Sequence, residues 1–457
     1  MSFVSRNPHD GAELARYPAM KADQIDQALR EAAACQPGWA ARPLHERSLY
    51  LRRLAVVLRG EREELAARAT REMGKRLVES RAEIDKCALL CEYYADEAER
   101  LLADEPIETD AQRSLVRIHP LGTVLAIMPW NFPFWQVFRC AVPALLTGNA
   151  VLLKHASSVP QCALAIERLF HAAGFDEPLF RTLLIRAEQV AGIVRDPRVH
   201  AVSLTGSEQA GRQVAAEAGA ALKPSLLELG GSDAFVVLED ASLDLAVEQA
   251  LVSRFQNNGQ SCIAAKRFVV VDSIADEFAS RLADGAAGLL PSDPMDEQCR
   301  LGPMARVDLR DELHEQVRDA VARGAGLLCG GVPSANSHAG YPATVLDGVA
   351  PGMRAWDEEL FGPAASIIRV PDEARALEVA NATRFGLGGS VWTADVERGA
   401  RFASRMICGC AFVNGMVRSD PRLPFGGVRD SGYGRELGRP GLTAFANLQT
   451  LWIGRSN

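Results

Sequence analysis

Hydrophobic residues recur at a helical spacing in the front part of the chain. Between residues 21 and 103 they return every three or four positions, as at Leu51 and Leu54, and Gly60 and Gly74 interrupt the pattern. This period is that of amphipathic helices, which bury one face. The sequence therefore predicts a helical region here.

The pattern then changes to short apolar runs rich in β-branched residues. The runs predicted as strands are TVLAIM, AVLLK, FRTLLI, HAVSLT, SLLEL and AFVVL, followed by RFVVV, AASIIRV, GSVWT and CAFVN. Amphipathic stretches such as 274–289, 308–324 and 373–381 lie between them. Strands that alternate with helices predict an α/β fold with a parallel, doubly wound sheet, and a second α/β block begins near residue 245.

Length and composition fit a folded protein of several domains. The 457 residues exceed one ordinary core, since domains usually hold about 100–200 residues. Hydrophobic residues make up 48% and charged residues 24%, which excludes a disordered or fibrous chain. A net charge of -8 and the absence of a long Lys/Arg cluster argue against nucleic acid as a partner and favour small molecules.

Compartment and metal content are expected from the N-terminus and the cysteines. The opening MSFVSRNPHDGAELARYP has no export or organelle signal, and no apolar run is long enough to cross a membrane. The 10 cysteines form no CxxC pair, so we expect reduced thiols in a cytoplasmic protein and no zinc site.

Glycine and proline mark four stretches where chemistry could gather: 127–135, 203–211, 227–233 and 423–438. Taken singly, such residues after a strand usually only close a turn. SLTGSEQAG is more informative, because a strand, Gly206 and Ser207 precede a helix whose free N–H groups could bind a pyrophosphate. It does not match the GxGxxG pattern.

The sequence around two side chains can be interpreted in two ways. Cys262 follows the polar segment QNNGQS, which would expose its sulfur, or it merely caps the next strand. Glu228 lies within SLLELGG, flanked by leucines at a strand end, where it either faces solvent or is a buried acid with a shifted proton affinity. The residues alone do not decide between these alternatives.

Seven ordered motifs resemble those of the aldehyde dehydrogenase superfamily. They are PWNFP, LLK, LTGSxxxG, LELGG, NxGQxC, EExFGP and PFGGxxxSGxGRE, and they span most of the chain. The segments LLKHAS, LELGGSD, LGPMARVDLRDELH and VNGMVRSDPRLPFGG are most similar to the shorter bacterial NAD(P)-dependent succinate-semialdehyde dehydrogenases. The resemblance implies a Rossmann-type cofactor domain (1–108 and 121–229), a catalytic α/β domain (230–440) and a small β bridging element (109–120 and 441–457), which would join subunits into a homodimer or homotetramer.

The resemblance also implies roles for individual residues. Cys262 would attack the aldehyde and pass through a thiohemiacetal and a thioester; Asn131 and the Cys262 backbone N–H would bind the oxyanion. Glu228 would activate the water that hydrolyses the thioester, and its presence argues for a free acid as product. Cofactor-binding positions are Trp130, Lys154, Ser157, Gly206, Ser207, Glu359 and Phe361.

Ser157 and Arg139 bear on cofactor and substrate choice. Many NAD-using relatives have a glutamate where this chain has Ser157, and a hydroxyl can donate to a 2′-phosphate. We therefore expect NADP to be accepted as well as NAD, and a preference for NADP stays open. Arg139, about two helical turns after Asn131, and Ser419 would bind a distal carboxylate, with Arg418 as a further candidate; Arg139 could instead pair with a surface acid. Succinate semialdehyde is the expected substrate, and the alternatives are another aldehyde such as glutarate semialdehyde, or a non-catalytic binding protein on this scaffold.

Overall fold

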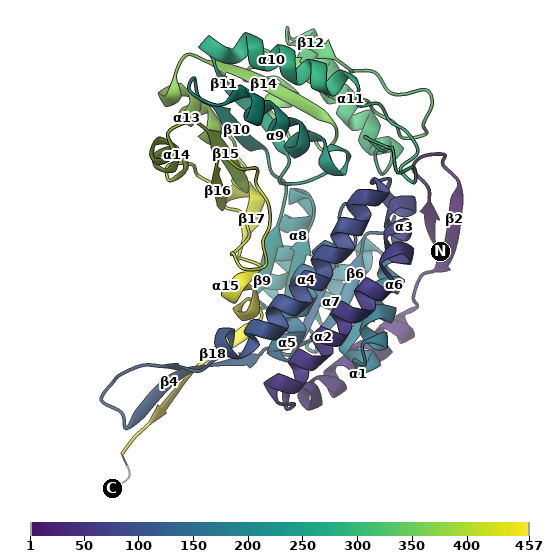
Figure 1. Cartoon of the computed structure of the whole chain (residues 1–457). Helices are drawn as coiled ribbons and strands as arrows, with labels where there is room; N and C mark the ends of the chain where they lie inside the picture. Colours follow the sequence, from purple (N-terminus) through teal and green to yellow (C-terminus); the bar gives the residue numbers. More distant parts are fainter. Residues whose placement is uncertain (1, 456–457) are drawn as a thin grey trace.

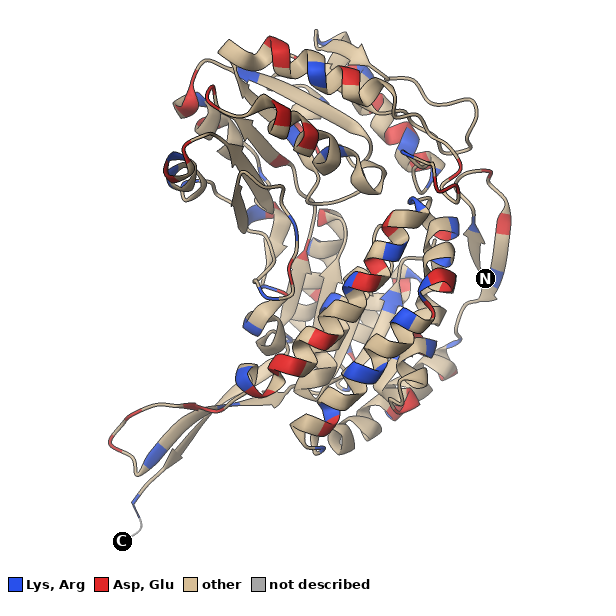
Figure 2. Cartoon of the chain, in the orientation of Figure 1, with Lys and Arg blue, Asp and Glu red and all other residues tan. Residues whose placement is uncertain are grey.

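The computed structural model describes residues 2–455, which form two lobes and a narrow arm (Figure 1). The chain begins with an antiparallel hairpin of β1 (Ser2–Arg6) and β2 (Glu13–Pro18). The predicted helical region follows as α1 (Ala22–Ala40), α2 (Leu44–Gly60), α3 (Arg62–Met73) and α4 (Leu77–Leu101). Gly74 ends α3 in the left-handed region, with φ +81°, which a residue with a Cβ rarely adopts. Acidic and basic residues are interspersed along these helices (Figure 2).

The first lobe contains a six-stranded sheet with the order β17-β9-β8-β5-β6-β7. Its strands are β5 (Thr123–Met128), β6 (Ala150–His155), β7 (Phe180–Thr182), β8 (Ala201–Thr205), β9 (Ser225–Glu228) and β17 (Gly432–Tyr433). The helices between them are α5 (Trp135–Thr147), α6 (Pro160–Ala172), α7 (Ala187–Arg195) and α8 (Glu208–Ala220). The strand order reverses beside β5, and crevices at such points bind ligands at the carboxyl ends of parallel strands.

The second lobe contains a seven-stranded sheet with the order β12-β13-β14-β11-β10-β15-β16. Its strands are β10 (Asp233–Val237), β11 (Ala265–Val271), β12 (Gly326–Cys329), β13 (Thr344–Asp347), β14 (Ala364–Val370), β15 (Gly388–Trp392) and β16 (Cys410–Val413). Its helices are α9 (Leu243–Phe255), α10 (Asp272–Ala287), α11 (Val307–Ala322), α12 (Arg354–Asp357), α13 (Glu373–Asn381) and α14 (Val396–Ala403).

The arm is a three-stranded antiparallel sheet that projects from the first lobe (Figure 1). β4 (Arg113–Pro120) lies between β3 (Glu105–Pro106) and β18 (Ala446–Ile453), and α15 (Gly438–Thr443) precedes β18. These segments are those expected to form a bridging element. The domain boundaries themselves stay a prediction.

The predicted α/β class is confirmed, and the strand runs named from the sequence all form strands. The sheets are not purely parallel, because β17 pairs antiparallel with β9 and β12 pairs antiparallel with β13. The N-terminal hairpin, β12 and β13 were not predicted. No helix within residues 2–455 combines the length and apolarity that crossing a membrane requires.

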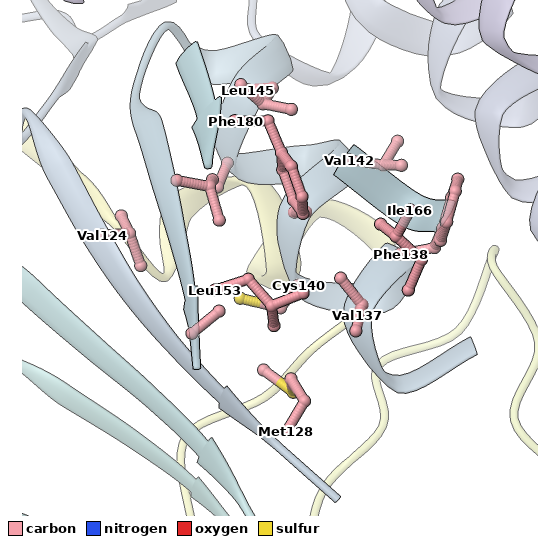
Figure 3. Packing of buried hydrophobic residues seen from close by; sticks show 14 of the residues in the cluster. Val124, Met128, Val137, Phe138, Cys140, Val142, Leu145, Leu153, Ile166 and Phe180 are labelled. Carbon is pink, nitrogen blue, oxygen red and sulfur yellow. The ribbon is translucent and has the colours of Figure 1, made fainter. Parts of the chain in front are cut away.

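Helix α5 is buried along its whole length, and this fixes the side chains that it presents to the site. Val137, Phe138 and Cys140 pack into the core against β5 and β6 (Figure 3). A fully buried helix cannot rotate without opening cavities in a close-packed interior. The polar side chains Gln136 and Arg139 are therefore held toward the centre of the molecule.

Candidate active site

The turn that carries Cys262 has an uncommon backbone. Asn257, Asn258 and Gly259 follow one another in the left-handed region, with φ of 53°, 56° and 72°. A Cβ on Gly259 would lie 2.5 Å from the carbonyl group of Gly362, so this position accepts only glycine. Left-handed residues of this kind cost free energy and persist only where their surroundings hold them.

Side-chain hydrogen bonds supply that support. The amide of Asn257 donates to the carbonyl of Asn131 at 2.9 Å. The amide of Asn258 donates to the carbonyls of Gly74 and Pro303 at 2.8 and 2.9 Å. Because these partners belong to the helical layer and to the second lobe, the turn is tied to both sides of the molecule.

Lys266, which is fully buried, supports the turn through hydrogen bonds to its backbone. Its ammonium donates to the carbonyls of Ser261 and Cys262 at 2.9 and 2.8 Å. It also pairs with the carboxylate of Glu359 at 3.1 Å, and that carboxylate accepts the N–H of Gly231 at 3.1 Å. One lysine therefore connects the backbone of the candidate nucleophile to a predicted cofactor-binding residue.

Cys262 is half-buried and lies on the wall that two cavities share. The larger cavity has a volume of about 410 Å³ and the smaller about 250 Å³, and Gln136 is the other side chain common to both. The structure thus favours the interpretation of Cys262 as an accessible thiol over that of a strand cap. A group bound in either cavity can reach this residue.

The thiol is neutral in this environment. Burial raises the pKa of Cys262 to about 12. Arg139 and Lys266 oppose the rise, whereas Glu359 and Glu228 add to it. Since only a thiolate is strongly nucleophilic, the proton must leave Cys262 as the sulfur attacks.

Asn131 lines the larger cavity together with Cys262. It is buried, and its amide nitrogen donates to the carbonyl of Gln260 at 3.0 Å. An amide nitrogen carries a second hydrogen. One donor therefore stays available beside the sulfur, as an oxyanion site requires.

Glu228 is a buried acid, which answers the question left by its position at a strand end. Its Oε1 has no hydrogen-bond partner among the described residues and would lie 2.6 Å from a Cβ on Gly426. Burial raises the pKa of Glu228 well above its ordinary value; Arg139 opposes this shift and Glu436 adds to it. In the described part of the chain Glu228 lines neither cavity, although its charge acts on Cys262.

Five predicted cofactor residues line the larger cavity: Trp130, Gly206, Ser207, Glu359 and Phe361. The rings of Trp130 and Phe361 meet edge to face at 5.8 Å. Ser207 caps α8, and its hydroxyl accepts the N–H of Ala210 at 3.4 Å. The free N–H groups at the start of this helix favour an anion.

The other two predicted cofactor residues do not line this cavity. Lys154 is the penultimate residue of β6, directly beside β5, and Ser157 follows the strand with an exposed side chain. Burial lowers the pKa of Lys154, and the charge of Glu188 opposes that shift. Both residues lie at the carboxyl edge of the sheet that also carries Trp130 and Gly206.

All three predicted substrate-binding residues line the smaller cavity, but they differ in how far they are buried. Arg418 is exposed, whereas Arg139 and Ser419 are buried. Arg139 forms an ion pair with the equally buried Glu436. Arg139 is therefore paired with an acid, but this acid is buried and is not the surface acid considered from the sequence.

Sequence reasoning missed several residues of the site. Gln136 lies three positions before Arg139, so the shared helix face was a usable signal. Glu436 stands inside the motif GRE but was given no role. Lys86 also lines the smaller cavity. Its sequence position gave no signal, because polar residues beside the apolar face are ordinary in any amphipathic helix.

Similarity to known proteins extends over the whole chain. The profile described as "Aldehyde dehydrogenase family" matches residues 1–451. The succinate semialdehyde dehydrogenase Sad of Escherichia coli, named with NAD(P)+, is 47% identical over 452 residues, which cover 99% of this chain and 98% of that protein. A probable NADP+ succinate-semialdehyde dehydrogenase of Synechocystis is 45% identical over 453 residues, covering 99% of this chain and 100% of its own length. The crystal structure of succinic semialdehyde dehydrogenase from Streptococcus pyogenes in complex with NADP+ has a TM-score of 0.97 and 35% identity, covering 99% of this chain and 100% of that chain. This chain belongs to the aldehyde dehydrogenase family.

Proposed function

We propose that this protein oxidises succinate semialdehyde to succinate with NAD(P)+ as electron acceptor. The observation that carries the proposal is the position of Cys262 between two cavities of different character. The larger lies at a dinucleotide-type sheet edge, and the smaller is lined by the cationic side chains of Lys86, Arg139 and Arg418. Relatives of that name at 47% and 45% identity support the same substrate.

The chemistry proceeds on Cys262. Its sulfur loses a proton to solvent and attacks the aldehyde carbon, so that a C–S bond forms and the carbonyl electron pair moves to oxygen. Asn131 and the Cys262 backbone N–H donate to this oxyanion, and removing such a donor typically costs about 2.7–4 kcal/mol of barrier. A bound NAD(P)+ would supply the acceptor for the hydride of the same carbon, so that Cys262 would then carry a thioester.

Glu228 completes the cycle as the base. Its ionised carboxylate takes a proton from water, whose oxygen attacks the thioester carbon, and the sulfur leaves as a thiolate. The balance is aldehyde, NAD(P)+ and water converted to carboxylate, NAD(P)H and two protons. Because burial raises the pKa of Glu228, the required ionised form becomes populated only as the pH rises.

The larger cavity fits a dinucleotide. Its volume of about 410 Å³ is within the usual range of ligand sites, which is about 300–1,000 Å³. The buried hydroxyl of Thr205 on its wall has no hydrogen-bond partner among the described residues. Trp130, Gly206, Ser207, Glu359 and Phe361 would contact the cofactor there, with Lys154 and Ser157 at the adenosine ribose. Without an acid at Ser157, the 2′-phosphate of NADP meets no repulsion, so we propose that both cofactors are used.

The smaller cavity would hold the distal carboxylate of the substrate. Arg139, Ser419 and Arg418 remain the residues proposed from the sequence for this contact. An uncharged aldehyde would leave these polar groups facing an apolar chain, which is costly in a buried site. Glutarate semialdehyde, which has one more methylene, is the nearest alternative substrate. One methylene changes the free energy of discrimination between two substrates by only about 1–3 kcal/mol.

We further propose that subunits associate through the arm, giving a homodimer or homotetramer. Leu448 and Trp452 on β18 are 57% and 55% exposed. Large apolar residues on a projecting strand favour pairing with another chain. The division into cofactor, catalytic and bridging segments stays as proposed from the sequence.

Steady-state kinetics test the function directly. Succinate semialdehyde, glutarate semialdehyde, butanal and betaine aldehyde would each be measured with NAD and with NADP. We expect the highest kcat/KM for succinate semialdehyde. Reduction of either cofactor with betaine aldehyde, but with neither semialdehyde, would refute the proposal. Cys262→Ala should lose turnover with every aldehyde and keep cofactor binding, measured by fluorescence.

A further inference from the structure

Helix α5 starts without a capping side chain of its own. Its N-cap residue is Phe134, and no acidic residue stands in its first turn. The first N–H groups of a helix have no partners within that helix, and those of α5 are buried. A buried donor without an acceptor is costly. The acceptor must therefore come from another element.

Glu83 on α4 is that acceptor. Its Oε1 accepts the N–H groups of Phe134 and Trp135, both at 2.8 Å. Its Oε2 accepts a hydrogen bond from the ammonium of Lys75, and both side chains are buried. A carboxylate at this end also complements the helix dipole. Both oxygens of Glu83 are thus used, and Lys75 fixes their orientation.

Lys75 also contacts the segment before the helix. Its ammonium lies 4.1 Å from the centre of the Phe132 ring, and Phe132 directly follows Asn131. The face of an aromatic ring attracts a cation placed in this way. The ion pair therefore holds the chain on both sides of Pro133, through the Phe132 ring and through the backbone of Phe134.

The rest of this segment is held through its carbonyl groups. Asn257 donates to the carbonyl of Asn131 at 2.9 Å. Burial lowers the pKa of His155 to about 4, so its ring is neutral; Nδ1 accepts the N–H of Ala156, and Nε2 donates to the carbonyl of Pro133 at 2.8 Å. Each of the residues 131–134 thus has a partner from elsewhere in the fold.

The turn that carries the candidate nucleophile is supported by the same segment, residues 74–83. The carbonyl of Gly74 accepts the amide of Asn258 at 2.8 Å. The carboxylate of Glu79 accepts the N–H of Asn257 at 2.9 Å. This segment therefore fixes the oxyanion donor and the nucleophile relative to one another.

We propose that Glu83, oriented by Lys75, is a positioning residue: it fixes the start of α5 and thereby holds the Asn131 amide where the oxyanion forms. This inference rests on the proposed function, because it takes Asn131 as the oxyanion donor. Glu83 acts through the backbone N–H groups of α5 and not on the substrate. A displacement of about 1 Å at a reacting centre can cost about 100-fold in rate.

Glu83→Gln tests this role, because it keeps the shape of the side chain but leaves one acceptor oxygen for three donors. We expect kcat to fall roughly 10- to 100-fold, with cofactor affinity, measured by fluorescence, unchanged. The factor should be the same for succinate semialdehyde and for butanal, since the oxyanion forms on every aldehyde. Glu83 also lines the smaller cavity, so a loss confined to the carboxylated aldehyde would show that its charge acts on that substrate, and would overturn the inference.

A second variant removes the ion pair without leaving a buried charge. Glu83→Gln leaves Lys75 unpaired, whereas Lys75→Met combined with Glu83→Leu replaces both partners by apolar side chains of similar volume, which proteins often tolerate. The combined variant still lacks an acceptor for α5, so its kcat should also fall roughly 10- to 100-fold. A kcat within twofold of wild type in either folded variant would overturn the inference.

Glu72 provides a matched control, because it caps another helix in the same way. It is 2% exposed and accepts the N–H groups of Gln161 and Cys162, at the start of α6, at 3.0 and 2.8 Å. None of these three residues lines either cavity in the described part of the chain. Glu72→Gln should weaken the fold in urea unfolding and leave kcat within about twofold. An equal loss of kcat in this control would attribute the effect of Glu83→Gln to general stability and overturn the inference.

A double-mutant cycle with Asn131→Ala distinguishes the inference from the proposed function. Once the amide is absent, Glu83→Gln should lower kcat by less than about threefold further, because residues that act as a unit are not additive. Losses that multiply in the double variant would overturn the inference and leave the function intact.

The remaining outcomes of the cycle are also decisive. If Asn131→Ala alone keeps the wild-type kcat, the oxyanion assignment and the inference both fail. If wild type oxidises butanal but neither semialdehyde, the proposed substrate fails, and the same cycle measured with butanal still decides the role of Glu83.

Discussion

Replacing Glu228 by glutamine tests the central chemical step. The two side chains have the same shape, and Glu228 is only 2% exposed, so the substitution removes the ability to accept a proton without opening a cavity. Positioned general bases contribute about 10²–10⁴ in rate, which corresponds to about 2.7–5.5 kcal/mol of barrier. We therefore expect Glu228→Gln to form the thioester at a normal rate and to hydrolyse it at least 100-fold more slowly.

Stopped-flow absorbance at the NAD(P)H band would show this as a burst of about one equivalent per active site followed by a slow phase. In wild type, kcat should rise with pH as Glu228 ionises, because burial raises its pKa, and this rise should be absent in the variant.

The pH dependence of the free energy of unfolding provides an independent check on the raised pKa of Glu228. Between its ordinary pKa and its raised pKa, the folded protein keeps a proton on Glu228 that the unfolded chain has released. Stability from this group therefore falls as pH rises across that range, by about 1.4 kcal/mol per pH unit. Glutamine does not titrate, so the variant should be the more stable of the two toward high pH in urea unfolding.

The matched control is Glu312→Gln, an exposed carboxylate on the wall of the larger cavity that has no proposed proton transfer. It should show neither the burst nor the altered pH profile. Normal steady-state turnover by Glu228→Gln would refute the assignment of the base.

Three further predictions concern the oxyanion, the cofactor and the assembly. Asn131→Ala should lower kcat by about 10²–10³ with little change in cofactor affinity, and an unchanged kcat would exclude its amide from the oxyanion site. Ser157→Glu should weaken NADP at least tenfold, about 1.4 kcal/mol, and spare NAD, whereas equal losses with both cofactors would place Ser157 away from the 2′-phosphate. Trp452→Glu should shift the mass measured by light scattering toward the monomer, and an unchanged mass would show that the arm does not join subunits.

Most helices and strands could be predicted because the patterns that mark them lie within short stretches of sequence. The strands around RFVVV and AASIIRV are buried on both faces and therefore appear as continuous apolar runs. β12, by contrast, is a mostly exposed edge strand whose GLLC gives no such pattern. β17 contains two residues and exists only because Gly432 pairs with Glu228, a contact that no local pattern encodes.

The candidate site was predictable where a motif marked it and unpredictable where charges from distant segments meet. Cys262, Asn131 and Glu359 lie inside motifs, and the structure brings them to one cavity. Arg139 pairs with Glu436, which is remote in sequence, so the partner of this guanidinium could not be read from the helix that carries it. Lys86 became visible only once α4 was seen to form a wall of the smaller cavity.

The hydrogen bonds and ion pair of Lys266 thermodynamically link cofactor affinity to the acidity of the Cys262 thiol. Lys266 lowers the pKa of Cys262 and Glu359 raises it, while the two are paired with each other. A ligand that draws the Glu359 carboxylate away from the sulfur removes the opposing charge, and the pKa of the thiol falls. Linkage is reciprocal, so the thiolate form must then bind that ligand more tightly than the thiol form does, by the same factor. Cofactor affinity measured as a function of pH would therefore also report the ionisation of Cys262, before any aldehyde is present.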